Sequence, residues 1–308
     1  MIWFLLAALL PGLYWEQGVE TAPALKKAGL QRVYVPAEHE QAWRAAGFTA
    51  VAFDPQRHAK AEAPGVQYRL SVASATSVPW IDANGWRFQR NVGKTWSYSV
   101  PARKAALAMA EPYAYGVDAV VRLDPPDLDL FARMLAFLRR IDRPRMPALA
   151  NIGIVDDGSD VTGEVLNLLA RRNLLFKVLM APDPRYDLNV RIGSKEYPEE
   201  EAADPYTFAG KLRYQLTDEK RLVRIYGSDV VLVRLTGDGE RARLHLINYA
   251  NRRVNGLRVR MLGEYRAGEL AAFGIDNAAL LDYAARDGAT EFTVPDIDTY
   301  AVVDLVKR

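Results

Sequence analysis

One short stretch of the chain gathers aromatic, acidic, amide and basic side chains. Residues 77–98 follow neither the period of a helix nor that of a strand, and they are rich in aromatic and turn-forming residues. Long segments without secondary structure are uncommon in compact domains unless they have a function. Flat rings beside hydrogen-bonding groups are typical of a sugar-binding cleft, because the rings stack on sugar faces and the polar groups bind hydroxyls. With one tryptophan from the first expected strand, the candidate substrate-binding residues are Trp15, Trp80, Asp82, Asn84, Trp86, Arg87 and Trp96.

The same stretch has a structural explanation. Tryptophans are large and mostly buried, so those of residues 77–98 would also serve as core that closes the mouth of an α/β domain. The sequence leaves both interpretations open.

Three carboxylates are candidates for catalysis. Glu16 follows the first expected strand, and Asp124 follows the strand expected at residues 119–123; strand carboxyl ends hold the ligand in α/β folds. Glu111 lies on the helix expected at residues 101–115. Hydrolysis of a glycosidic bond needs two carboxyl groups, about 5–5.5 Å apart for retention and about 6.5–9.5 Å for inversion. We expect Glu16 to pair with Glu111 or Asp124; the alternative is that each carboxylate is a helix cap or an ion-pair partner.

Other reaction classes lack their usual motifs. Gly93-Lys94-Thr95 resembles the end of a phosphate-binding loop, but Phe88 occupies the position where that loop requires glycine. The three histidines lack the spacing of metal ligands, and neither a Gly-x-Ser-x-Gly elbow nor a dinucleotide fingerprint occurs. We therefore expect no cofactor and no metal site.

The composition is that of an ordinary globular protein. The chain has 308 residues, enough for two or three domains, and 50% of them are hydrophobic. The 40 lysines and arginines nearly balance 38 acids, so no strongly basic surface for nucleic acid is expected. Arginine pairs such as residues 171–172 are expected at solvated helix ends or turns. The absence of cysteine excludes disulfides, thiolate metal sites and a cysteine nucleophile.

The first ten residues form an apolar run that is too short to cross a bilayer as a helix. The run resembles the core of an export signal, although it lacks a basic start and a clear cleavage site. We predict a periplasmic or secreted protein without an integral membrane span. The alternative is a buried first strand or helix in a cytoplasmic protein.

Alternating elements must position the candidate residues. Before residue 54 the chain has a strand–helix rhythm, with strands expected at residues 13–15, 32–35 and 49–53. Short loops in this rhythm indicate a parallel sheet or a segment of a (β/α) barrel. A complete eightfold barrel does not fit before residue 150, so we expect a partial one.

The architecture changes at Asn151. An apolar run at residues 152–155, an acidic turn, an amphipathic helix and a second apolar run at residues 174–179 predict a βαβ unit. Asp156 and Asp157 lie at the N-terminus of that helix, where acids stabilise the helix dipole, and this explains them better than a ligand site does.

From residue 222 the pattern is almost entirely β. Alternating strands recur, and residues 237–240, Gly-Asp-Gly-Glu, predict a hairpin turn. The expected fold class is therefore α/β followed by an all-β sandwich. We expect a signal segment at residues 1–12, a barrel-like segment at 13–147, a flavodoxin- or amidotransferase-like βαβ domain at 148–221 and the sandwich at 222–308.

Three stretches resemble parts of the family 42 β-galactosidases, in which a barrel precedes an amidotransferase-like domain and a small β domain. Residues 152–158, Ile-Gly-Ile-Val-Asp-Asp-Gly, resemble the start of the amidotransferase-like part. Residues 244–249 and 300–305 resemble strands of the C-terminal domain. The resemblance implies a glycoside-hydrolase-like architecture, although the family's Asn-Glu acid/base pair has no match here. The family's amidotransferase-like domain is not catalytic, and the absence of cysteine agrees with this.

We predict a carbohydrate-active, glycoside-hydrolase-like protein that binds a carbohydrate ligand and hydrolyses a glycosidic bond with two carboxylates. The alternative is a non-catalytic protein of the cell envelope that binds glycans or assembles as a homo-oligomer. A nucleic-acid partner is not expected.

Overall fold

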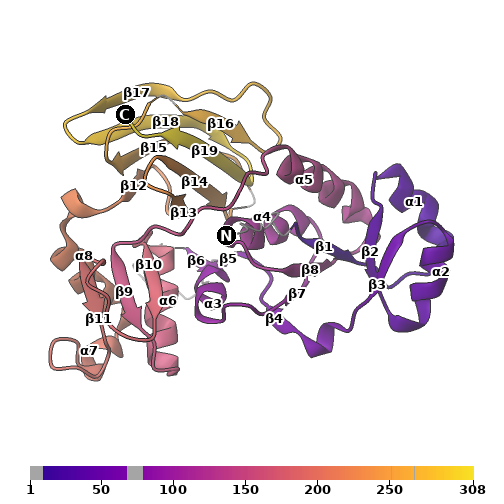
Figure 1. Ribbon diagram of the computed structural model, residues 1–308, viewed down its shortest axis with the longest axis horizontal. Coiled ribbons are helices and arrows are strands. Elements are labelled where there is room, and N and C mark those ends of the chain that lie inside the picture. Colours follow the sequence, from indigo (N-terminus) through magenta and orange to yellow (C-terminus); the bar gives the residue numbers. More distant parts are fainter. Residues whose placement is uncertain (1–9, 68–78, 251, 267) are drawn as a thin grey trace, which may run out of the picture. The chain divides into compact units, whose positions relative to one another are not determined.

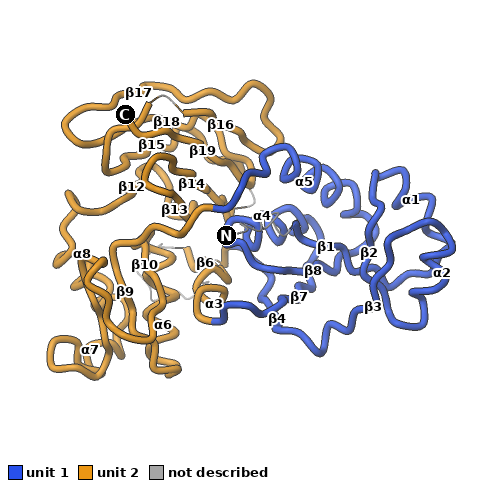
Figure 2. The backbone as a smooth tube through the Cα atoms, viewed as in Figure 1, with its two compact units in different colours: residues 1–65, 91–145 blue, residues 66–90, 146–308 orange. Residues whose placement is uncertain are grey.

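The computed structural model describes residues 10–67, 79–250, 252–266 and 268–308. Two compact units share the chain (Figure 2): residues 1–65 with 91–145, and residues 66–90 with 146–308. The chain thus leaves the first unit after residue 65 and returns to it at residue 91. Residues 1–9, most of the expected signal segment, lie outside the described residues. The expected domain boundaries at residues 148 and 222 stay predictions.

The first unit contains a six-stranded sheet in the order β3-β2-β1-β8-β7-β4, and every pair in it is parallel. Each strand of this sheet lies beside the one before or after it in the chain, and β8 joins β1. This is the strand order around a barrel that is open between β3 and β4. The strands are β1 (Gly12–Tyr14), β2 (Arg32–Val35), β3 (Thr49–Ala52), β4 (Ala59–Ala61), β7 (Trp96–Ser99) and β8 (Ala119–Arg122).

Alternation along these strands gives the sheet two different faces. Leu13, Val33 and Val121 are fully buried on one face, whereas Tyr34 and Arg122 on the other face are half-buried or exposed. The helices of this unit are α1 (Ala22–Lys27), α2 (Glu40–Ala45), α4 (Ala105–Tyr115) and α5 (Leu128–Arg140) (Figure 1). The sequence explains their ends; α4, for example, stops where Gly116 adopts the left-handed conformation with φ 68°.

The second unit contains the expected βαβ layer. Its three strands are parallel in the order β10-β9-β11, with α6 joining β9 to β10. Ser159 caps α6, its Oγ accepting a hydrogen bond from the Thr162 N–H at 3.1 Å. The elements of the layer are β9 (Ile152–Val155), α6 (Asp160–Arg171), β10 (Phe176–Leu179), β11 (Leu188–Val190), α7 (Glu199–Ala202) and α8 (Pro205–Lys220).

The same unit contains the expected β-sandwich, whose two antiparallel sheets have the orders β12-β15-β18-β17 and β13-β14-β19-β16. Inward-facing residues of both sheets, such as Val259 and Leu244, share one apolar core. The turn at residues 237–240 joins β13 and β14, which confirms the predicted hairpin. The strands are β12 (Val223–Tyr226), β13 (Val231–Gly237), β14 (Arg241–Asn248), β15 (Val254–Leu262), β16 (Glu269–Ala272), β17 (Leu281–Arg286), β18 (Ala289–Ile297) and β19 (Tyr300–Val306).

The prediction that residues 77–98 are irregular is wrong. The described part of this stretch forms β6 (Trp80–Asp82), helix α3 (Gly85–Arg90) and β7, while residues 77 and 78 lie outside the described residues. Strand β6 pairs with β5 (Gly65–Gln67). These elements are too short to show a period, so the pattern of the sequence hides them.

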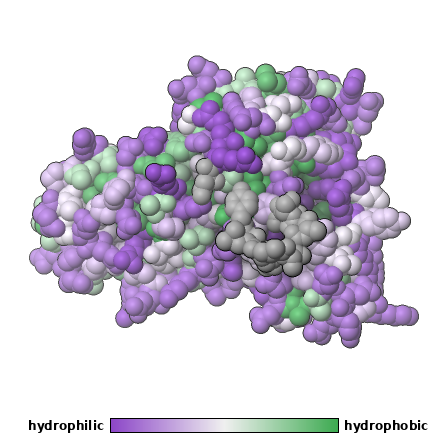
Figure 3. All heavy atoms as spheres, turned by 180° about the vertical axis from the view of Figure 1, so that it is seen from behind, coloured by the Kyte–Doolittle hydropathy of each residue, from purple (hydrophilic) through white to green (hydrophobic). Residues whose placement is uncertain are grey.

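Polar and charged residues are spread over the surface with small apolar patches between them. Figure 3 shows this mixture on one face, in agreement with a formal net charge of +2. Within the described ranges no helix is both long and apolar enough to span a membrane.

Candidate functional site

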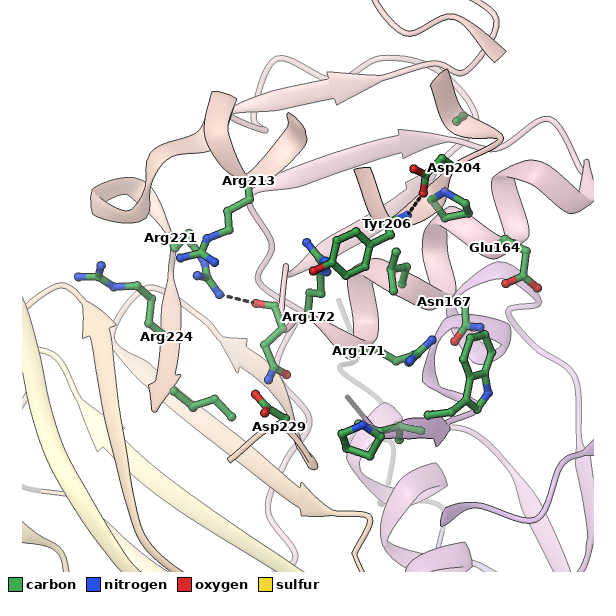
Figure 4. Close-up of a pocket in the computed structure, with 18 of the residues that line it drawn as sticks. Glu164, Asn167, Arg171, Arg172, Asp204, Tyr206, Arg213, Arg221, Arg224 and Asp229 are labelled. Atoms are coloured by element: carbon green, nitrogen blue, oxygen red, sulfur yellow. Dashed lines mark hydrogen bonds between the residues drawn. The ribbon is translucent and has the colours of Figure 1, made fainter. Parts of the chain in front are cut away.

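The second unit contains a groove of about 1290 Å³ (Figure 4). Strand β6 contributes Trp80 and Ile81, helix α6 contributes residues along its whole length from Asp160 to Arg171, and α8 contributes residues from its start to Asp218 near its end. The walls are completed by strand β12, so the βαβ layer and the sandwich both contribute to the groove. All of these residues belong to one compact unit.

Charged side chains line the groove in equal numbers of each sign. The arginines are Arg171, Arg172, Arg213, Arg221 and Arg224. The acids are Asp160, Glu164, Asp204, Asp218 and Asp229. Some of these acids have structural partners: Asp204 caps α8 by accepting from the Tyr206 and Thr207 N–H groups at 3.1 and 3.2 Å.

Two aromatic rings of the groove each carry a guanidinium. The Arg171 guanidinium lies 3.9 Å from the centre of the Trp80 ring, and that of Arg172 lies 3.8 Å from the centre of the Tyr206 ring. The indole N–H of Trp80 donates to Asp82 Oδ1 at 3.0 Å, which holds the ring in place. Arg172 covers one face of the Tyr206 ring, and a ligand can contact the other. Tyr206 is 60% exposed.

Three guanidiniums converge on one carboxylate at one end of the groove, as Figure 4 shows for the arginines. Nitrogens of Arg213, Arg221 and Arg224 lie 2.9, 3.2 and 3.7 Å from the Asp218 carboxylate oxygens. Hydrogen bonds from the Arg213 and then the Arg221 guanidinium lower the pKa of Asp218 to about 2. Arg221 is buried, which lowers the pKa of its guanidinium. We call Arg213, Arg221 and Arg224 the arginine cluster.

Thr217 makes this convergence geometrically feasible. The residue interrupts α8 with φ 62° and ψ 157°, a conformation that non-glycine residues rarely adopt. The chain therefore turns sharply just before Asp218, and Arg221 and Arg224 follow in the direction of β12.

The predicted substrate-binding residues of the second unit have different positions. Trp80 lines the groove, and Asp82 orients it while also accepting from Gln67 at 2.6 Å. Trp86 packs near Gly163 of α6, and the Arg87 guanidinium covers its ring at 4.5 Å. Trp86 and Arg87 thus pack against protein, in agreement with the alternative that residues of this stretch have a structural role.

Three predicted residues are enclosed by protein, which corrects the expectation that they line a cleft. Asn84 is fully buried, and its carbonyl accepts from the Phe88 N–H within α3. Trp15 and Trp96 are each 3% exposed in the first unit, and the Trp15 indole donates to Thr21 Oγ1 at 2.8 Å. Both tryptophans lie on the covered face of the sheet, where burial of their apolar ring surface stabilises the fold.

The three predicted catalytic carboxylates all lie in the first unit. Glu111 of α4 is fully buried and accepts a hydrogen bond from the Tyr98 hydroxyl at 2.8 Å, so no substrate reaches it in this structure. Glu16 and Asp124 are exposed beyond the carboxyl ends of the neighbouring strands β1 and β8. The strands are in register with Tyr14 opposite Arg122, so each acid stands two residues past a paired residue, on the same face.

An ion pair connects the ends of these two strands. Arg122 Nη2 lies 2.7 Å from Glu16 Oε2, and both side chains are partly exposed. Burial, and then the charge of Glu16, raise the pKa of the Tyr14 hydroxyl. Of the two pairings expected for Glu16, the structure brings Asp124 to the same sheet edge and places Glu111 in the core.

Sequence reasoning missed most of the groove. Arg171 and Arg172 do end helix α6, as expected, but they stack on aromatic rings instead of extending into solvent. In the sequence, the arginine cluster is indicated only by the high frequency of arginine after residue 212. For the acids, no group of three or more within the described ranges is arranged to hold a metal ion.

No protein-family model and no curated protein matches the chain. Solved structures do resemble it: α-L-fucosidase isoenzyme 2 from Paenibacillus thiaminolyticus superposes with a TM-score of 0.54 at 9% identity, covering 70% of this chain and 60% of that one. A rhamnosidase from Novosphingobium sp. PP1Y has a TM-score of 0.43 at 11% identity over 70% of this chain and 31% of its own. A family 42 β-galactosidase from G. stearothermophilus has a TM-score of 0.36 at 9% identity over 92% of this chain and 61% of its own.

The fold is therefore similar to that of glycoside hydrolases. Only the fucosidase exceeds a TM-score of 0.5 among these three, and at 9% identity it shows the fold alone. The chain spans 60% of the length of that enzyme.

Proposed function

We propose that the protein is carbohydrate-active and of the glycoside-hydrolase type, and that the groove beside Trp80 binds its glycan. The observation that carries the proposal is the lining of the groove: ring faces of Trp80 and Tyr206 stand among guanidinium and carboxylate groups. Rings supply stacking for the apolar faces of sugars, and the charged groups supply hydrogen bonds for hydroxyls. The glycoside-hydrolase-like fold supports the same substrate class.

The size of the groove favours an extended ligand. Its volume of about 1290 Å³ exceeds the roughly 300–1,000 Å³ of common small-molecule pockets. We therefore propose an oligosaccharide rather than a single sugar.

A binding experiment tests this assignment with a matched pair of tyrosines. Tyr206 and Tyr214 are both exposed on α8, and only Tyr206 contributes to the groove. We expect Tyr206→Ala and Trp80→Ala to weaken glycan binding about three- to tenfold, as expected for the loss of one ring contact, and Tyr214→Ala to leave it unchanged. Calorimetric titration with oligosaccharides that a glycan array selects would measure this. Equal losses in all three variants would reject the groove as the site.

As a second proposal, independent of the groove in the second unit, we infer that Glu16 and Asp124 of the first unit hydrolyse a glycosidic bond. In the two-carboxylate mechanism one group protonates the leaving oxygen while the other attacks the sugar or activates water. We assign the role of nucleophile or base to Glu16, because Arg122 lies 2.7 Å from its carboxylate. Asp124 is then the general acid.

Turnover of aryl glycosides tests this catalytic proposal. We expect Glu16→Gln and Asp124→Asn to lower kcat/KM at least about a hundredfold, a typical contribution of acid–base catalysis. Asp129→Asn is the control, because this side chain is exposed on α5 in the same unit and pairs only with its helix neighbour Arg133 among its described ion pairs. Turnover by Glu16→Gln equal to that of the unchanged protein would refute catalysis by this pair.

Two finer proposals remain. We propose that the order of a barrel-like sheet, a βαβ layer and a sandwich corresponds to the architecture of the family 42 β-galactosidases, on the residues 152–158, 244–249 and 300–305 that resemble it. We also propose export to the periplasm or medium, because the first ten residues are apolar. Cell fractionation and the N-terminal sequence of the mature protein would test export.

A further inference from the structure

We propose that the glycan bound in the groove carries an anionic group, a carboxylate, sulfate or phosphate, and that the arginine cluster recognises it. This inference rests on the proposed function, since it names the class of glycan for the same groove.

Positive charge exceeds negative charge within the cluster. The three guanidiniums of the arginine cluster share one carboxylate, that of Asp218. Three positive charges thus face one negative charge, an excess of two. Glu291 lies on β18, which β15 separates from β12, and Arg258 and Arg260 already pair with it at 2.6 and 3.8 Å. A bound anion would reduce this excess.

Donors in the cluster are incompletely satisfied. Within the part of the chain that the structure describes, the Nε–H groups of Arg221 and Arg224 are buried and have no hydrogen-bond partner. The other Arg221 nitrogens donate to Asp218 Oδ1 at 3.2 Å and to the Asn173 carbonyl at 3.3 Å. Buried donors without acceptors cost free energy, and because these Nε–H groups have no accessible surface, an anion in the groove would stabilise the two guanidiniums through its charge rather than by bonding to Nε.

A ligand can reach the cluster from the groove. All three arginines line the groove, and the Arg213 side chain is 52% exposed. Planar guanidiniums suit carboxylate, sulfate and phosphate groups, because two parallel N–H groups match two oxygens. Tyr206, at the other end of α8, lies in the same groove and supplies the ring contact for the sugar. An acidic sugar would use both features.

Matched oligosaccharides test the inference by calorimetric titration. The probes are a neutral galactose oligosaccharide, the galacturonate oligosaccharide of equal length, and sulfated and phosphorylated forms of the neutral probe. We expect one of the anionic forms to bind about ten- to a hundredfold more tightly than the neutral form, the contribution typical of hydrogen bonds to charged groups. The anionic form that gains most identifies the group.

Two variants connect that preference to the cluster. Arg213→Gln should weaken binding of the anionic probe about tenfold or more and that of the neutral probe much less, and because this side chain is largely exposed the variant should fold. Arg253→Gln, at an exposed position outside the groove, changes the total charge equally and should leave the binding of both probes unchanged.

The outcomes separate the inference from the proposed function. Equal affinity for the neutral and anionic probes, both weakened by Tyr206→Ala, would overturn the inference and keep the glycan groove. Loss of the anionic preference in Arg253→Gln as well would also overturn it, because net charge alone would then explain the gain. No binding of any probe would reject the proposed function together with the inference.

Discussion

Asn173 offers a sharp test of what holds the groove together. It follows α6 in the left-handed conformation, φ 53°, and its side chain is directed at strand β13 of the sandwich. The amide donates to the Val231 carbonyl at 3.0 Å and accepts from the Val233 N–H at 2.8 Å, in a buried position. One side chain thus joins the βαβ layer to the sandwich beside the arginine cluster.

Replacement of Asn173 by alanine should be strongly destabilising. Two buried hydrogen bonds are lost and two backbone groups are left unsatisfied, which costs about 1.5 kcal/mol for each bond. The left-handed conformation adds about 1 kcal/mol for alanine. We therefore expect Asn173→Ala to lower the free energy of unfolding by about 4 kcal/mol. Asn173→Gly should lose about 3 kcal/mol, because glycine adopts this φ without strain.

Asn277 supplies the matched control. It has nearly the same conformation, φ 50°, but lies exposed on the sandwich. Asn277→Ala should cost about 1 kcal/mol, the backbone term alone. Urea unfolding followed by circular dichroism and tryptophan fluorescence would measure all three variants. A loss for Asn173→Ala no larger than that for Asn277→Ala would show that the two hydrogen bonds do not stabilise the unit.

Three further variants test other parts of the structure. His245 is fully buried, and burial followed by the charges of nearby arginines lowers its pKa well below 6.5. As pH falls below 6.5 the unfolded chain gains a proton that the folded chain does not, so the free energy of unfolding should decrease by up to about 1.4 kcal/mol per pH unit. His245→Gln should lack this pH dependence, which urea unfolding at pH 7.5 and 5.5 would measure. Thr217→Gly should raise the midpoint of thermal unfolding by relieving a strain of about 1 kcal/mol, whereas a lower midpoint would mean that the Thr217 side chain contributes more than the strain costs. Arg90→Met should destabilise the second unit by about 3 kcal/mol, because Arg90 donates two hydrogen bonds of 2.9 Å to the nearly buried Asp156 carboxylate. A change in the free energy of unfolding of less than about 0.5 kcal/mol, the size typical of a surface substitution, would contradict this.

The turn at Asp156 and Asp157 shows where sequence reasoning was sufficient and where it was not. Asp157 Oδ1 accepts from the Ser159 N–H at 2.9 Å, and the hydrogen bonds of this turn lower its pKa although burial opposes the shift. Asp157 thus acts locally in the turn before a helix, as its position in the sequence indicated. The ion pair of Asp156 with Arg90, 66 positions away, is a tertiary contact that the sequence did not predict.

Ring burial was harder to predict. Trp80 and Trp86 are six residues apart and similar in type, yet one borders the groove and the other packs on α6. A sequence shows that a residue is large and apolar, but not which helix will cover it. Trp86 packs as core, whereas Trp80 borders a groove, and sugar binding by this stretch stays a prediction.

The sequence by itself determined the local elements: the parallel strand–helix rhythm, the βαβ unit, the Asp204 cap and the hairpin at residues 237–240. Their signals are periodicity and turn chemistry, which neighbours in the chain decide. Only the tertiary structure decided the groove. Arg171 reaches Trp80 across 91 positions of sequence, and the turn at Thr217 aims three guanidiniums at Asp218. Such convergence depends on how the elements pack, because charge and ring contacts act through space, and no pattern along the chain encodes those distances.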